Sequence, residues 1–236
     1  MVNKACMKKR FSKLSALLVL GLLLIGMSLA CYMWVRREQL QYTLNRQLIA
    51  ALLKNDMKQA RVLVEAGADP NTREEPAPAP TLSLLMQKLL HPSPPTTNTG
   101  STAFLLACRV KIIAVKGSNP AGSYFFHPPD PQLTQTMLLH GANVHAKDRE
   151  GTTALHTVVV CTYIGASLSD NMNTYNTNKE VISQLLAYGA DPDEEGKAYR
   201  GMFGKTPMKS ALGAVSLKAN AHPDLVALLR KYRKHP

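Results

Sequence analysis

The sequence predicts an all-α protein: a solenoid of about four helix–turn–helix repeats with inserted loops, preceded by one transmembrane helix. Two observations lead to this prediction. A short helix-ending string recurs three times, and the N-terminal region holds one long stretch without a charged residue. The chain has 236 residues, 45% of them hydrophobic, which is enough to bury a sizeable core.

The recurring string is Gly-Ala-Asp or Gly-Ala-Asn, and it begins at Gly67, Gly141 and Gly189. Each copy follows a run rich in Leu and other apolar residues that is typical of the end of an amphipathic helix. Glycine ends a helix well because it adopts the left-handed backbone conformation at little cost. A second string opens the helix that follows, at the threonines Thr102, Thr153 and Thr206.

Residues 141–156, Gly-Ala-Asn-Val-His-Ala-Lys-Asp-Arg-Glu-Gly-Thr-Thr-Ala-Leu-His, contain both strings without a break. This stretch closely resembles the ankyrin repeat, and the resemblance extends over roughly residues 40–232. It is looser at the second and fourth repeats. The resemblance implies paired helices joined by β-turns, with Thr153 and His156 bonded to each other and to turn backbone.

The predicted organisation has three parts: a basic segment at 1–13, a transmembrane signal anchor at 14–35, and an ankyrin-repeat domain at 36–236. The Gly-Ala strings lie further apart than the roughly 33 residues of a regular ankyrin unit. We therefore expect insertions between the repeat elements, at 72–100, 110–129 and 165–178.

The uncharged stretch runs from Leu14 to Val35, and 22 helical residues span about 33 Å, enough to cross a bilayer core. Five cations precede it, and Arg36 and Arg37 follow it directly. This bias predicts a single-pass protein with a cytoplasmic N-terminus and an extracytoplasmic repeat domain, periplasmic in a bacterium. Two alternatives stay open: cleavage before Cys31, which releases a secreted protein, or lipidation of Cys31.

The insertions contain apolar residues that need a partner. Residues 81–90 read as a short helix with Leu82, Leu85, Met86 and Leu89 on one face, and we expect this face to fold back onto the repeats. The stretch 110–129 is predicted as an enlarged loop with three adjacent aromatic residues, which either enters the core or forms a contact surface.

Cys108 and Cys161 are expected to be buried apolar thiols rather than a disulfide, because cysteine is among the residues most often buried. In an oxidising compartment a bridge between them is the alternative.

No enzyme signature survives inspection, and no cofactor or metal site is predicted. Gly204-Lys205-Thr206 resembles the end of a phosphate-binding loop, but Tyr199 stands where that motif needs glycine. His156 has no nucleophile or carboxylate at catalytic spacing. The net charge of +12 suits an anionic membrane surface or an acidic partner, and does not by itself indicate nucleic acid.

We therefore expect a non-enzymatic, membrane-tethered module that binds a protein partner. The resemblance implies binding through the β-turn tips and the exposed side of the inner helices, at Arg73, Lys147, Arg149, Thr157 and Ser210. One alternative is a small enzyme or ligand-binding protein with its site in the inserted loops. Another is an inhibitor or immunity-type protein that occludes an enzyme.

Overall fold

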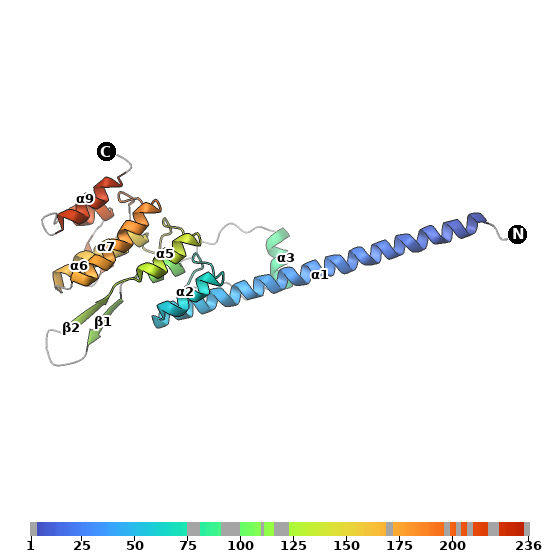
Figure 1. Cartoon of the computed structure of the whole chain (residues 1–236), viewed down its shortest axis with the longest axis horizontal. Coiled ribbons are helices and arrows are strands. Elements are labelled where there is room, and N and C mark those ends of the chain that lie inside the picture. Colours follow the sequence, from blue (N-terminus) through green and yellow to red (C-terminus); the bar gives the residue numbers. More distant parts are fainter. Residues whose placement is uncertain are drawn as a thin grey trace. The chain divides into compact units, whose positions relative to one another are not determined.

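The structure is a computed structural model of the whole chain (Figure 1). It describes residues 4–74, 81–90, 100–109, 111–115, 123–168, 172–195, 199–201, 204–206, 210–216 and 222–233. The described part is mostly helical, as predicted. The helices are α1 Lys4–Lys54, α2 Met57–Glu65, α3 Leu82–Leu90, α4 Ala103–Ala107, α5 Pro131–Leu139, α6 Ala154–Leu168, α7 Met172–Ala187, α8 Ala211–Ser216 and α9 Pro223–Lys231.

The chain divides into two compact units. The first contains Met1–Tyr42 and Pro78–Pro94, which hold most of α1 and all of α3. The second contains Thr43–Ala77 and Pro95–Pro236, and it holds the predicted repeats.

In the first unit, α1 is long and apolar enough to cross a membrane, as predicted from its composition. Its large apolar side chains are exposed, including Leu22, Leu23 and Met27. The guanidinium of Arg36 lies 6.0 Å from the centre of the Tyr32 ring, one helical turn away. Aromatic and cationic residues of this kind favour the boundary between lipid and water.

In the second unit, the helices pack as pairs and the pairs contact their neighbours. α4 packs on α5, α6 on α7, and α8 on α9, while α2 contacts α5, α5 contacts α7, and α7 contacts α9. The core includes the last turns of α1 and side chains from each later pair, for example Leu48, Val64, Phe104, Leu155 and Leu225.

Three helices end where the sequence predicts. Gly67, Gly141 and Gly189 have φ angles of +100°, +82° and +92°, in the left-handed region that favours glycine. The start of α5 is also as expected: Oδ1 of Asp130 accepts a hydrogen bond from the backbone N–H of Gln132 at 2.9 Å, and proline occupies the first turn.

The fold is not all-α as expected, because it contains two short β-hairpins. Strand β1 Lys111–Val115 pairs antiparallel with β2 Ser123–His127, within the segment predicted as a loop at 110–129. Strand β3 Tyr199–Gly201 pairs with β4 Gly204–Thr206. The β1 and β2 sequences, Lys-Ile-Ile-Ala-Val and Ser-Tyr-Phe-Phe-His, are rich in β-branched and aromatic residues, which favour strands over an irregular loop.

The polar loop predicted at 165–178 is wrong as well. α6 continues to Leu168 and α7 begins at Met172, so only 169–171 lies outside the described residues. The Asn and Thr residues there have low helix propensity, but α6 and α7 pack on each other, and tertiary packing overrides such preferences. Within α7, the Thr177 hydroxyl donates to the backbone carbonyl of Asn173 at 2.9 Å.

The insertion at 72–100 contains the predicted helix α3; that its apolar face folds back onto the repeats stays a prediction. Leu82, Met86 and Leu89 are exposed, and no described residue of the insertion belongs to the repeat core. The side chain of Leu85 lies outside the described residues. The insertion is closed at its base, where the Glu74 N–H donates to the Ser101 carbonyl at 2.9 Å.

Candidate functional site

The turns that follow the Gly-Ala strings share one local geometry. In each, the Asp or Asn after alanine accepts a hydrogen bond, through its side-chain oxygen, from the backbone N–H two residues further on. The distances are 2.8 to 2.9 Å, for the pairs Asp69–Asn71, Asn143–His145 and Asp191–Asp193. Such Asx turns fix the backbone of each turn. We call the residues 69–73, 143–150 and 191–195 the turn edge.

The first and second turns are joined by one side chain. The Asn71 amide nitrogen donates to the carbonyl of Gly141 at 2.9 Å, and its Oδ1 accepts from the N–H of Asn143 at 2.7 Å. The first turn is also joined to α1, because the N–H of Asp69 donates to Oδ1 of Asn45 at 2.8 Å. These bonds satisfy backbone groups that would otherwise need water.

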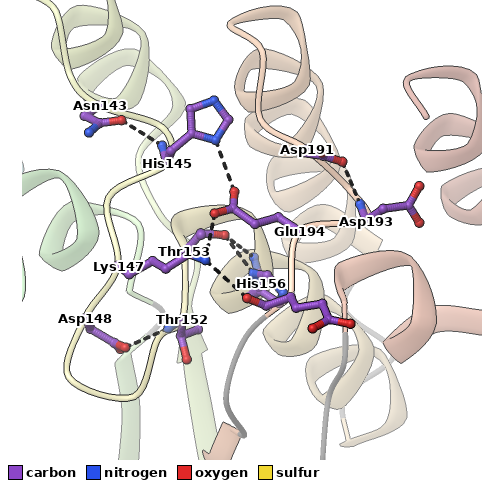
Figure 2. A network of polar contacts seen from close by, with 11 residues as sticks. Asn143, His145, Lys147, Asp148, Thr152, Thr153, His156, Asp191, Asp193 and Glu194 are labelled. Carbon is purple, nitrogen blue, oxygen red and sulfur yellow. Dashed lines mark hydrogen bonds and ion pairs between the residues drawn. The ribbon is translucent and has the colours of Figure 1, made fainter. Parts of the chain in front are cut away.

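The second and third turns are joined by Glu194 (Figure 2). The Lys147 Nζ lies 2.9 Å from Glu194 Oε1 and donates to the carbonyl of Glu195 at 3.2 Å. The His145 Nδ1 lies 3.1 Å from Glu194 Oε2. Partial burial acts to raise the pKa of Glu194, but the contacts with His145 and Lys147 outweigh it and lower that pKa.

His156 is almost fully buried at the start of α6. Its Nδ1 is 2.7 Å from Oγ1 of Thr153, and that oxygen also accepts the His156 backbone N–H at 3.5 Å. A hydroxyl that accepts from the backbone is free to donate to Nδ1, which assigns the ring proton to Nε2. The Nε2 atom makes no hydrogen bond of ordinary geometry, although the Glu194 backbone lies close enough to favour a protonated ring.

The bond between Thr153 and His156 was implied by the ankyrin resemblance, and the structure contains it. Burial lowers the pKa of His156, and the opposing negative charge of Glu194 only partly offsets this effect. The neutral imidazole of His156, held by Thr153, orders the turn and therefore has a structural role.

The five residues expected to bind a partner have different environments. Arg73 Nη1 donates to the Gly100 carbonyl, and Lys147 pairs with Glu194. The Thr157 hydroxyl donates to the Thr153 carbonyl, and Ser210 Oγ accepts from the Gly213 N–H. The fifth, Arg149, has an exposed side chain on the tip of the second turn. These contacts help to hold the turns and the starts of the helices in place. They involve Arg73, Lys147, Thr157 and Ser210.

The expected buried thiols are present. Cys108 and Cys161 are both buried, and neither forms a disulfide bond. Burial raises the pKa of Cys108 to about 12, against a smaller lowering by its contact with Thr134, so this thiol is unreactive near neutral pH.

A second polar cluster, which the sequence analysis did not identify, joins α7 to α9. Asp224 accepts a hydrogen bond from the Tyr175 hydroxyl at 2.7 Å and pairs with Lys179 at 2.5 Å. The Tyr175 ring stacks on His222, with 4.8 Å between ring centres. The bond from Lys179 lowers the pKa of Asp224 to about 2. His-Pro-Asp at 222–224 signals a helix start, but nothing in the sequence pairs it with α7.

Side chains hold successive turns to one another, so the turn edge is an ordered surface. Within the described ranges, no group of three or more His, Cys, Asp or Glu residues could hold a metal ion. The chain matches no protein-family model and none of the curated proteins compared with it.

Proposed function

We propose that this chain is a membrane-tethered ankyrin-repeat protein that binds a protein partner along its turn edge and does not act as an enzyme. The observation that supports the proposal best is the pair of cross-links between successive turns, by Asn71 and by Glu194. A binding surface that is already ordered loses little conformational freedom when a partner docks.

The ankyrin assignment is supported by three features together. Helix pairs contact the next pair along the chain, each Gly-Ala string ends a helix at positive φ, and an Asx turn follows each glycine. Repeats of this kind bury their apolar faces on one another, so the exposed edge remains for binding.

The tether is α1, and we place the repeats on the extracytoplasmic side because cations are concentrated before the apolar stretch. A reporter fused after Pro236 tests this orientation. We expect activity from a reporter that works only outside the cytoplasm, such as alkaline phosphatase, and none from a cytoplasmic one. The opposite pattern would overturn the proposed topology.

Photo-crosslinking in native membranes tests the binding surface. A photoreactive residue at position 149, on the turn edge, is expected to give a discrete protein adduct, and one at exposed Leu139 on α5 is expected to give none. The purified partner is then titrated with the variant Arg149→Glu. We expect affinity to fall about tenfold, which corresponds to about 1.4 kcal/mol. Equal adducts at both positions, or unchanged affinity, would contradict binding at this edge.

A charge reversal at Lys147 needs a control of its own. Reversing the charge of Lys147 also breaks its ion pair with Glu194, so a loss of binding could follow from a disturbed turn. The variant Lys147→Met therefore serves as a control that reports how much the cross-link itself contributes.

A further inference from the structure

Helix α3 has an exposed apolar face. Around a helix of 3.6 residues per turn, Leu82, Met86, Leu89 and Leu90 fall on one side, and all four are exposed. Gln87 lies away from this side and Leu84 lies opposite it, and both are exposed. Exposed apolar faces of this kind mark an interaction surface.

The insertion that contains α3 is closed at its base. Arg73 and Thr102 form an antiparallel bridge, and the Arg73 side chain donates to the Gly100 carbonyl at 2.6 Å. The Ala103 N–H donates to the Thr72 carbonyl at 2.7 Å. The chain therefore leaves the second unit and returns to it at adjacent, hydrogen-bonded positions.

Helix α3 belongs to the same compact unit as the apolar part of α1. The segment 78–94 of this unit contains Lys88 and no acidic residue. A helix of nine residues is about 13 Å long, too short to span a bilayer, but an amphipathic helix of this kind can lie in the boundary between headgroups and acyl chains.

We propose that α3 docks by its apolar face on the surface of the membrane that α1 crosses, on the side where the repeats lie. The inference rests on the proposed tether. The lipid surface is favoured over a protein groove because α3 is grouped with the membrane segment and lacks acidic residues, which anionic headgroups would repel.

Tryptophan quenching tests this proposal in the full-length protein. The chain contains one tryptophan, Trp34, near the end of the apolar stretch of α1. The protein is reconstituted in phosphatidylcholine–phosphatidylglycerol liposomes whose acyl chains carry bromine, which quenches tryptophan that reaches the lipid. In the wild type, loss of Trp34 fluorescence reports the tether itself.

The helix is then probed in a Trp34→Phe background. We expect Leu89→Trp to lose fluorescence, most strongly with bromine placed near the headgroups, and Gln87→Trp, away from the apolar face, to lose clearly less. Leu139→Trp, on a repeat helix at nearly the same exposure as Leu89 (67% against 69%), is expected to keep its fluorescence. Leu82→Trp provides a second position on the apolar face should Leu89→Trp fold poorly.

The two proposals fail in different ways. Quenching of Trp34 with no quenching at positions 82 and 89 would overturn docking of α3 and leave the tether intact; α3 would then be a surface for a protein. Equal quenching at 87, 89 and 139 would also overturn it, because adsorption would not involve the apolar face. No quenching of Trp34 would overturn the tether, and the docking that depends on it.

Discussion

Asn71 and Asn143 join two successive turns: Oδ1 of Asn71 accepts the backbone N–H of Asn143 at 2.7 Å. The two residues lie far apart in the sequence: Asn71 comes two residues after the first Gly-Ala string, and Asn143 ends the second. The amide nitrogen of Asn71 also bonds the Gly141 carbonyl, so a single side chain holds both a donor and an acceptor of the next turn. This relationship fixes the register of one turn against the next.

Replacing Asn71 by Ala is expected to destabilise the repeats. The change removes two hydrogen bonds at a partly exposed position, so the free energy of unfolding should fall by about 1–2 kcal/mol. Urea unfolding of the full chain in detergent, followed by circular dichroism, measures it. Asn71→Asp keeps the acceptor and should recover part of the loss. Asn176→Ala, at an exposed position of α7, should change stability by less than about 0.5 kcal/mol.

Acidification should weaken the fold through His156. Burial lowers the pKa of His156 from its ordinary value of 6.5, so below pH 6.5 the unfolded chain binds a proton that the folded chain resists. The contribution of this residue to stability is complete above pH 6.5 and is lost as the pH falls through the lowered pKa. Unfolding between pH 8 and pH 5 should therefore show a steeper pH dependence in the wild type than in His156→Gln. Equal slopes would count against a neutral, buried imidazole.

Glu194 should contribute at more acidic pH. Contacts with His145 and Lys147 lower its pKa from 4.5 in spite of burial, so its stabilising effect is present above pH 4.5 and is lost as the pH falls below that value. Glu194→Gln should remove this part of the acid sensitivity. The neighbouring Glu195→Gln leaves the side-chain contacts of Glu194 in place and is the matched control. If the two variants have the same acid midpoint, Glu194 does not link the turns in solution.

The last helix should loosen when Asp224 is replaced. Asp224→Asn weakens the contacts with Lys179 and Tyr175, and because the Asp224 side chain is 46% exposed, solvent screening limits the cost to less than about 1 kcal/mol. Hydrogen exchange is the suitable measurement, since it reports local opening. Amides of α9 should exchange faster while those of α5 keep their rates. A uniform change across both helices would show that the cluster does not act locally.

The helix stop at Gly141 should tolerate asparagine better than alanine. At φ +82° a side chain strains the backbone, although no atom lies within 4 Å of the position a Cβ would take. Gly141→Ala is therefore expected to cost about 1–2 kcal/mol by backbone strain alone. Gly141→Asn should cost less, because asparagine enters the left-handed region more readily. Thermal unfolding of both variants measures the order; a smaller loss for alanine would contradict it.

Helix ends were predictable because single residues determine them. The φ angles at Gly67, Gly141 and Gly189 and the cap at Asp130 follow from local chemistry that does not depend on the rest of the chain. The N-terminal helix was predictable for a similar reason, since an uninterrupted apolar stretch leaves few alternatives.

Features that depend on distant partners were not predictable in the same way. The Asn and Thr residues near 172–177 look like a loop until α6 supplies a packing surface. The aromatic run at 124–126 was identified, but its strand partner lies before the intervening segment at 116–122, and pairing of this kind depends on register. The partners of Glu194 and Asp224 could not be predicted, because His145, Lys147, Tyr175 and Lys179 lie over 40 residues away in sequence.

The bridge between Arg73 and Thr102 has a consequence for engineering. The chain leaves the repeats and returns to them at adjacent, hydrogen-bonded positions, so the segment between could be exchanged without altering the spacing of the helices on either side. A two-residue connection in place of 75–99, or a small foreign domain grafted there, should leave the cooperative unfolding of the repeats intact. The inserted segment would then be replaceable, while the helices on either side keep their structure.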